Sequence, residues 1–315
     1  MAQMIKRSEG GATRSGARPT PRAFQLAVVA LVVGGGLIAG EPVDAQAGPR
    51  NMGPVVNSAS RDAEPTFSAD GGTMYFNCMD RPGRTGNDIC VSTLVEGEWS
   101  EPIVVEEVST PGYTEVEPLL SPDGAQLYIM SDRPGGFGSF DIWVSEWVDG
   151  RWGEPVNLGA PINSPAADHC IYFAGSEWEL AYWTSTRARG FGGNDIWMSE
   201  RVNGVWQEPV NLGPSVNTAA SEHHSLPSPD GRSLYVTSDR AGGLGGEDIY
   251  VTTRGADGTW GPLVNLGPAV NSERSDRCPA FSPDHSVFYF DSERVGGNGN
   301  KDLWFVPYAV VEGVR

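Results

Sequence analysis

EVEPLLSPDGAQLYIMSDRPGGFGSFDIWVSEWVDGRWGEPVNLGAPINS, residues 115–164, is the stretch of sequence that decides the fold. The same pattern recurs four more times at a spacing of 53 or 54 residues and fills the chain from about residue 50 to its end. A fixed period of this length indicates one supersecondary unit that buries its apolar faces by stacking on its neighbours. We therefore expect a closed array of five copies of one unit.

Each unit contains four β-like runs separated by turns. The first run begins with an acid and ends in a turn such as SPDG at 121–124, where proline fixes φ, aspartate caps the backbone and glycine accepts a positive φ. The second run is LYI at 127–129, and a glycine-rich loop leads to the third run, DIW at 141–143. The fourth run carries a tryptophan in four of the units: Trp99, Trp152, Trp206 and Trp260. Five such units predict an all-β fold, a five-bladed β-propeller of four-stranded blades.

The two ends of the repeat region complement each other. The last unit stops without a tryptophan or an NLG segment, and NMGPVVNS at 51–58 supplies the missing tail of a unit. We therefore predict that the ring closes by pairing of the N- and C-terminal segments, because closure removes exposed sheet edges. No helix is required after residue 47.

The first 47 residues differ in kind from the rest. Five basic residues precede an uncharged apolar run of 15 residues, Leu26–Gly40, and small residues follow at 43–47. The run is short for a bilayer span, so we predict an export signal peptide at 1–47 and a propeller domain at 48–315. An uncleaved N-terminal anchor is the alternative. The first cysteine is Cys78, so no lipid-modified N-terminus is expected, and the predicted location is the periplasm or the medium, without stable membrane insertion after cleavage.

Charge and cysteines add two expectations. The chain carries 40 acidic and 22 basic residues, a net charge of −18, which argues against a nucleic-acid partner. Export permits disulfides, and Cys78 at the end of one run faces Cys90 at the start of the next, so we predict a Cys78–Cys90 bridge. Cys170 and Cys278 occupy the same position in units three and five, so a bridge between them is a weaker second prediction.

The repeat resembles a known family. An opening acid, S-P-D-G, L-Y-F, S-D-R, a glycine-rich loop and D-I-W together resemble the WD40-like (PD40) β-propeller repeats found in the TolB-type propeller of bacterial envelope proteins. The resemblance covers about 265 residues. It implies a non-enzymatic propeller that binds a protein or another ligand in the cell envelope, although such repeats identify a fold better than a function.

An arginine and an aspartate flank the glycine-rich loop in every unit. One interpretation is an ion site, since such loops expose backbone N–H groups and aspartates bind hard cations. No cofactor is predicted, and a divalent cation is the alternative. The other interpretation is structural, and repetition in every blade favours it. The arginines are Arg81, Arg133, Arg187, Arg240 and Arg294, and the aspartates are Asp88, Asp141, Asp195, Asp248 and Asp302.

The recurring tryptophans are expected to pack between blades. Trp147 and Trp178 break the period, so we predict that these two are exposed and functional.

The units differ most at the openings of their first runs, which should line the central channel. By strand alternation, the first and third residues of each opening share a face, which predicts a ring of five acids at the channel mouth and a second ring beside it. The ligand-binding candidates are Asp62, Glu64, Glu115, Glu117, Asp168, His169, Glu222, His223, His224, Asp276 and Arg277.

Three interpretations of these openings remain. The acids can be structural. Alternatively, clustered carboxylates with His224, Cys170 and Cys278 can bind a divalent metal, although no close ligand pair fixes its geometry. The third is glycan hydrolysis by two channel carboxylates. The prediction adopted is a monomeric, non-enzymatic binding scaffold whose partner is an envelope protein or glycan, with a glycoside hydrolase as the alternative.

Overall fold

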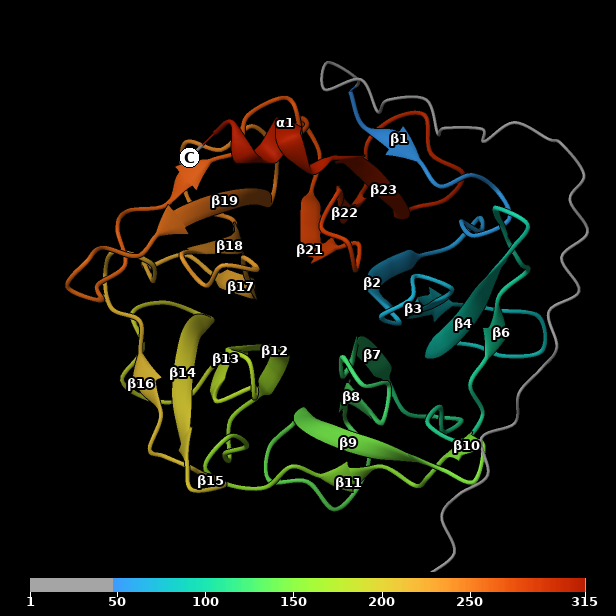
Figure 1. Ribbon diagram of the computed structural model, residues 1–315, viewed down its shortest axis with the longest axis horizontal. Helices are drawn as coiled ribbons and strands as arrows, with labels where there is room; N and C mark the ends of the chain where they lie inside the picture. The colour runs from blue at the N-terminus through green and yellow to red at the C-terminus, as the bar shows by residue number, and fades with distance from the viewer. Residues whose placement is uncertain (1–47, 315) are drawn as a thin grey trace, which may run out of the picture. The chain divides into compact units, whose positions relative to one another are not determined.

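The computed structural model of the protein describes residues 48–314, which form five antiparallel blades arranged in a ring (Figure 1). The predicted all-β, five-bladed propeller is therefore confirmed. Among residues 48–314, no helix is long and apolar enough to cross a bilayer. The predicted signal peptide lies outside the described residues.

In blades one to four the strands follow one another outward from the centre of the ring in chain order, and in blade five β1 is the outermost strand. Blade one comprises β2 (Asp62–Phe67), β3 (Thr73–Met79), β4 (Asn87–Val95) and β6 (Ile103–Val104). Blade two comprises β7 (Glu115–Leu120), β8 (Gln126–Ser131), β9 (Asp141–Val148) and β11 (Val156–Asn157). Blade three comprises β12 (Asp168–Ala174), β13 (Leu180–Ser185), β14 (Asp195–Val202) and β16 (Val210–Asn211). Blade four comprises β17 (Glu222–Pro227), β18 (Ser233–Ser238), β19 (Asp248–Thr253) and β20 (Val264–Asn265). Blade five comprises β21 (Asp276–Phe281), β22 (Val287–Ser292), β23 (Asp302–Pro307) and β1 (Arg50–Asn51).

Blade five is built from both ends of the described chain, as predicted. β1 pairs antiparallel with β23, so that Arg50 lies opposite Phe305 (Figure 1). The Asn57 side chain accepts a hydrogen bond from the Leu303 amide at 2.8 Å and donates one to the Leu303 carbonyl at 3.1 Å. The ring is therefore closed by main-chain and side-chain hydrogen bonds between segments about 250 residues apart.

The outermost strand differs from the prediction. The tryptophan-bearing runs form only two-residue strands, β5 (Glu98–Trp99), β10 (Arg151–Trp152) and β15 (Val205–Trp206), which pair with the far ends of β4, β9 and β14. The strand that completes each blade is the short segment that follows, such as Val156–Asn157. Residues 48–314 also contain one helix that the sequence did not indicate, α1 (Tyr308–Glu312), and its Val311 is buried against blades four and five.

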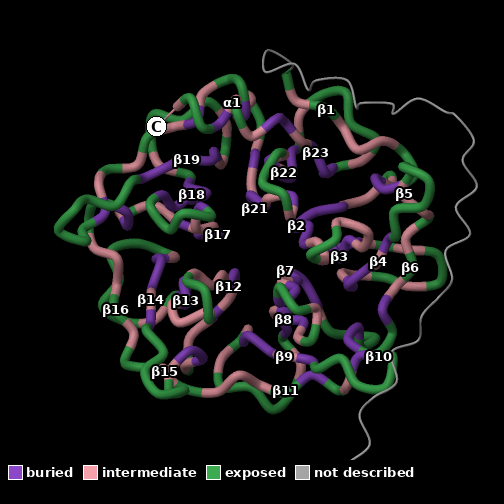
Figure 2. The backbone as a smooth tube through the Cα atoms, in the orientation of Figure 1, coloured by how far each residue is buried: buried purple, intermediate pink, exposed green. Residues whose placement is uncertain are grey.

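Apolar cores lie between neighbouring blades. Tyr75 and Ile89 of blade one, for example, pack with Leu127, Trp143 and Trp152 of blade two. Four further clusters of this kind join the other pairs of blades. Buried residues accordingly lie mainly in the strands, whereas exposed residues lie mainly in the loops and at the outer ends of the strands (Figure 2). The inter-blade packing predicted for the periodic tryptophans is confirmed for Trp143 and Trp152.

The two irregular tryptophans behave differently from each other. Trp147 is 46% exposed, as predicted, and its ring packs edge-on against the ring of Trp152. Trp178 is half-buried and stacks on Phe173 with ring centroids 4.5 Å apart. The prediction of an exposed Trp178 is therefore wrong, because its ring packs on Phe173 and on Tyr128 of blade two.

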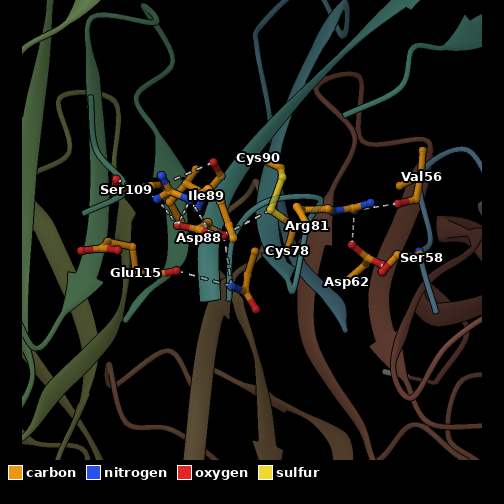
Figure 3. The surroundings of a disulfide bond; sticks show 12 residues. Val56, Ser58, Asp62, Cys78, Arg81, Asp88, Ile89, Cys90, Ser109 and Glu115 are labelled. Atoms are coloured by element: carbon orange, nitrogen blue, oxygen red, sulfur yellow. Dashed lines mark hydrogen bonds and ion pairs between the residues drawn. A yellow bond between two sulfur atoms is a disulfide. The ribbon is translucent and has the colours of Figure 1, made fainter. Parts of the chain in front are cut away.

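The predicted Cys78–Cys90 disulfide is present, with Cα atoms 5.8 Å apart (Figure 3). Its residues are not directly opposite, since Cys78 pairs with Asp88 and Cys90 with Phe76, so the bridge is diagonal. Cys170 and Cys278 are free and buried, and the second predicted bridge is therefore not formed.

Candidate functional site

The five opening acids do not line a channel mouth, contrary to the prediction. Asp62 is fully buried, accepts a hydrogen bond of 2.7 Å from Ser58 Oγ and pairs with the Arg81 guanidinium, which also bonds the Val56 carbonyl (Figure 3). The other four acids are equally buried and pair with the arginine of their own unit: Glu115 with Arg133, Asp168 with Arg187, Glu222 with Arg240, and Asp276 with Arg294. These acids therefore hold each blade to its incoming chain segment.

The aspartates that follow the glycine-rich loops are structural as well. Asp195 accepts a hydrogen bond of 2.6 Å from the Phe191 amide and one of 3.0 Å from the Asn211 side chain. Asp141, Asp248 and Asp302 have equivalent partners. In unit one, the Asp88 carboxylate accepts its side-chain hydrogen bonds from Arg84 and not from an asparagine. The structural interpretation of this motif is therefore correct, but the arginine of each pair binds the opening acid and not the loop aspartate.

A β-bulge in every inner strand separates the third residue of each opening from the first. The pairing register shifts between Ala63 and Thr66 in β2 and at the same place in the other four inner strands. At each bulge the third residue has a left-handed backbone, with φ between 47° and 61°. These five residues, called the axial ring below, are Glu64, Glu117, Cys170, His224 and Cys278. Because a bulge adds a residue, the alternation on which the prediction rested fails here.

Side chains of the axial ring converge on one another from five blades. Glu117 Oε1 lies 2.8 Å from Cys170 Sγ and 3.5 Å from His224 Nε2. Cys278 Sγ lies 3.1 Å from the same His224 Nε2 and 4.0 Å from Glu64 Oε1. All five belong to inner strands separated by more than 50 residues of chain, so only ring closure brings them together.

The two ring carboxylates also join neighbouring blades. Glu64 Oε2 accepts a hydrogen bond of 2.7 Å from the Glu117 amide, and Glu117 Oε2 accepts one of 2.5 Å from the Cys170 amide. Glu64 additionally pairs with Arg61. Each carboxylate thus fixes the bulge of the next blade.

The second residues of the openings form an adjacent polar layer in blades three, four and five. His169 lies with Nδ1 3.0 Å from Cys170 Sγ and with Nε2 3.1 Å from Asn194 Oδ1. His223 Nε2 lies 3.5 Å from Asn194 Nδ2, so one asparagine lies between the two imidazoles. Arg277 pairs with Glu247 at 3.0 Å.

The partners of this layer were not predicted from the sequence. Glu247 and Asn194 lie in glycine-rich loops, and Lys301 pairs at 3.1 Å with Asp291, which lies opposite Arg277 in blade five. A signal for Asp291 was available. The corresponding residues of the other second strands are uncharged: Asn77, Met130, Thr184 and Thr237.

The electrostatics of the cluster depend on Glu117. Burial alone would raise its pKa, but hydrogen bonds and charge interactions with His169 and His224 hold the pKa of Glu117 well below its usual range. Burial opposes protonation of His169, yet the Glu117 carboxylate raises the pKa of that imidazole. Burial and the neighbouring histidines lower the pKa of His223 to about 3, so His223 is neutral. Glu117 is therefore ionised at the centre of the cluster.

The two thiols are unreactive in this environment. Burial and the nearby Glu117 raise the pKa of Cys170 well above its usual value, and burial and Asp291 do the same for Cys278. Both thiols are therefore protonated as long as no cation replaces the proton.

A cavity of about 310 Å³ opens above the axial ring, whose five residues all line it. Its walls are mainly apolar and come from the later residues of the inner strands and from the hairpin turns. They include Phe67, Leu119, Ile171, Leu226 and Phe281, with Pro65, Pro118, Pro122 and Pro283. Of the predicted ligand-binding candidates, Glu64, Glu117 and His224 line this cavity, which lies on the hairpin side of the inner strands. We call this cavity the axial pocket.

Several residues can hold a metal ion here. Three sets have their donor atoms within 4.8 Å of one another: Glu117, Cys170 and His224; Glu64, His224 and Cys278; and His169, Cys170 and His223. The metal candidates Cys170, His224 and Cys278 are thus brought together, whereas Asp62, Glu115, Asp168, Glu222 and Asp276 are not part of the site.

Neither the family models nor the curated proteins give a match to this chain. Solved structures do. TolB from Acinetobacter baumannii matches with a TM-score of 0.51 at 15% identity, over 80% of this chain and 56% of that one. An α-L-arabinofuranosidase from Podospora anserina matches with a TM-score of 0.50 at 14% identity, over 82% and 93%. A second such enzyme, from Lactobacillus brevis, gives 0.50 at 14%, over 82% and 92%.

At these identities the comparisons establish the propeller fold alone, and the chain spans little more than half the length of the TolB protein. Propellers of this shape include both TolB and glycoside hydrolases, so the fold does not decide between a binding protein and an enzyme. Membership of the PD40 repeats remains a prediction.

Proposed function

We propose that this chain is an exported, non-enzymatic binding protein of the cell envelope, and that its ligand enters the axial pocket. The observation that carries the proposal is the pocket itself. Its volume of about 310 Å³ is at the lower end of the range for small-molecule sites, and apolar walls stand over a polar floor, as is usual for such sites. The ligand is accordingly a small molecule or the apolar end of an envelope protein or glycan.

Export is supported by two independent features. The basic and apolar segments of residues 1–47 have the pattern of a signal peptide. The buried Cys78–Cys90 disulfide fits an oxidising compartment. The proposed location is therefore the periplasm or the medium, and the proposed state is a monomer.

The alternative, a glycoside hydrolase, is less well supported by the site. Such an enzyme needs one carboxylic acid that stays protonated until it donates to the leaving group. The depressed pKa of Glu117 instead keeps this carboxyl group ionised, so that it has no proton to donate. Glu64 pairs with Arg61 and binds the Glu117 amide, so both carboxylates already have structural partners. The alternative is still tested below, because the arabinofuranosidases have a similar fold.

The proposal is tested by blocking the pocket. Ala69 is exposed in the first hairpin and lines the pocket, so Ala69→Trp should fill its mouth without disturbing a core. Ser176 is the corresponding residue of the third hairpin and does not line it, which makes Ser176→Trp the matched control. With the neutral fluorescent dye Nile red as probe, we expect saturable binding to the wild type and the control, weakened at least about tenfold in Ala69→Trp.

Equal dye binding by all three proteins would contradict the proposed pocket. Solubilised envelope extract should displace the dye from the wild type, which connects the pocket to its natural ligand. The enzymatic alternative is tested with a panel of arylglycosides, and turnover that Glu117→Gln abolishes would replace the binding function by hydrolysis.

A further inference from the structure

We propose that the axial ring is a metal centre that binds one zinc-class divalent ion through Glu117, Cys170, His224 and Cys278. The centre forms the floor of the axial pocket but does not depend on the ligand proposed above. The cluster has the size, donor chemistry and support that such a centre requires.

The first argument is the spacing of the donor atoms. Zinc binds sulfur at about 2.3 Å and nitrogen or oxygen at about 2.0–2.2 Å in a tetrahedron, so its ligand atoms lie roughly 3.3–3.8 Å from one another. Here the measured separations are 2.8 Å from Glu117 Oε1 to Cys170 Sγ, 3.5 Å from Glu117 Oε1 to His224 Nε2, and 3.1 Å from His224 Nε2 to Cys278 Sγ. Glu117 Oε1 is therefore already close to ligand spacing from Cys170 Sγ and His224 Nε2, and Cys278 Sγ is close to ligand spacing from His224 Nε2.

The second argument concerns the number of ions. The sets Glu117–Cys170–His224 and Glu64–His224–Cys278 share the Nε2 atom of His224. A neutral imidazole nitrogen offers one lone pair and therefore binds one metal ion. Both sets consequently belong to the same ion, which receives two sulfurs, one nitrogen and a carboxylate oxygen. Glu64 Oε1, at 4.0 Å from Cys278 Sγ, lies at the edge of this set.

The third argument is the type of donor. Thiolates and imidazole select zinc and other late transition metals, whereas calcium takes six to eight oxygen ligands. Only two carboxylates stand in the axial ring. Units one and two place glutamate at the bulge, and units three, four and five place Cys170, His224 and Cys278 at the same backbone position. The departures from the repeat thus supply three soft donors at the one position where five blades meet.

The fourth argument is support around the donors. His169 lies with Nδ1 3.0 Å from Cys170 Sγ and is oriented from its other nitrogen by Asn194, as expected of a neighbour that stabilises a bound thiolate. Cys170 and Cys278 are buried, at 3% and 1% exposure, and remain free thiols in a chain that also contains a disulfide. Both features fit sulfur atoms that are reserved for a metal.

The binding step balances in charge. A divalent ion enters, Cys170 and Cys278 lose their Sγ protons to solvent, and His224 binds through its Nε2 lone pair. Glu117 contributes a carboxylate oxygen. Metal binding therefore releases two protons for each ion bound, without oxidation or reduction.

The experiment uses the full chain, stripped with a chelator and titrated with zinc chloride against a chromogenic chelator. We expect one zinc ion per chain by elemental analysis, and a thermal midpoint that rises with zinc. Cys170→Ser and His224→Gln should each weaken binding by at least about tenfold. His285→Asn is the control, because His285 lines the pocket but belongs to none of the donor sets, and it should bind as the wild type does.

A cobalt(II) titration of the wild type keeps the proposal testable if the variants do not fold. Cobalt bound by thiolates gives sulfur-to-metal charge-transfer absorption in the near ultraviolet, and its absence would overturn the proposal. Two other results would do the same: no zinc retained at equimolar concentration, or zinc binding unchanged in Cys170→Ser with Cys278→Ser. Two ions per chain would contradict a single centre and indicate His169 and His223 as further ligands.

Dye binding in the axial pocket separates this inference from the proposed function. Ala69→Trp should lose Nile red and keep zinc, whereas the wild type stripped of metal with a chelator should lack zinc and keep the dye. The dye result therefore tests the pocket alone, and the zinc result tests the metal centre alone.

Discussion

Single residues in the hairpin turns carry a pH dependence that can be measured. Asp284 Oδ1 accepts hydrogen bonds from Ser282 Oγ at 2.6 Å and from the Ser286 amide and hydroxyl at 3.1 and 2.8 Å. Led by the Ser282 bond, these lower the pKa of Asp284 from 3.8 to about 2. The folded state therefore binds this proton less readily than the unfolded state, and the stabilisation is complete above about pH 4 and is lost as the pH falls towards 2.

We predict that Asp284→Asn lowers the free energy of unfolding at pH 5 and above, and that its difference from the wild type shrinks between pH 4 and pH 2. Denaturant unfolding at a series of pH values measures this. Ser282→Ala is the matched variant, because loss of its hydroxyl should move the pKa of Asp284 up towards 3.8, as carboxyl NMR shifts would report. A wild-type pKa near 3.8 would refute the argument.

At this scale the sequence predicted residue types better than their positions. The axial-ring residues could be named from the sequence because they depart from the repeat. Their geometry could not, because strand alternation places the first and third residues of an opening together, and the bulge at Glu64 and its equivalents reverses that arrangement. The buried Asp62–Arg81 pair was missed because the sequence pattern groups Arg81 with Asp88, at the other end of the glycine-rich loop.

At the scale of an element, the glycine-rich loops pack directly on the chain entering the next blade. A Cβ atom added to Gly138 would lie 1.7 Å from the Ala166 carbonyl oxygen and 3.0 Å from that of Ser164. Ser164 is itself held by the fully buried Asp168 at 2.6 Å, so this backbone cannot move away without loss of that hydrogen bond. A Cβ atom added to Gly192 or Gly245 would lie 2.0 or 1.9 Å from the equivalent carbonyl oxygen.

We predict that Gly138→Ala lowers the free energy of unfolding by about 3 kcal/mol, the upper part of the usual range for overpacking. Gly153→Ala is the control, since the nearest atom to its Cβ is the Glu146 carbonyl oxygen at 3.4 Å, and it should change stability by less than about 0.5 kcal/mol. Denaturant unfolding of both variants checks the difference. Equal stability of the two would show that the loop accommodates a side chain.

Elements with local signals were predictable from the sequence, and those without were not. The SPDG hairpins and the DIW strands carry turn chemistry and apolar patterning within a few residues. The outermost strands are two residues long, as in Val156–Asn157, and too short for any pattern, so the prediction assigned this role to the nearby tryptophans. α1 was not predicted, because five residues at the end of the chain show no helical period.

At the scale of the whole molecule, ring closure repeats a hydrogen-bond pattern found within other blades. Asn51 bonds Asp302 at 2.8 Å across 251 residues and accepts a bond from the Gly53 amide. Asn157 bonds Asp141 at 3.2 Å across 16 residues and accepts one from the Gly159 amide. The unit that is split between the two ends of the repeat region predicted this closure from the sequence. The axial pocket was not predictable, because it exists only after closure brings five distant strands to one axis.

The last prediction compares these two asparagines. Each replacement by alanine removes similar hydrogen bonds, which should cost about 1–3 kcal/mol.

Within residues 48–314, however, β1 is connected to the blades on one side only, through residues 52–61, whereas β11 is connected on both sides. Asn51→Ala should therefore release β1 locally, and the Met52 amide, bonded to the Leu303 carbonyl, should exchange its hydrogen at least about tenfold faster, since about 1.4 kcal/mol corresponds to a factor of ten. In Asn157→Ala, the Leu158 amide, bonded to the Ile142 carbonyl at 3.0 Å, should stay close to its wild-type rate. Equal acceleration at both sites would show that closure of the ring is no weaker than a blade formed by contiguous chain.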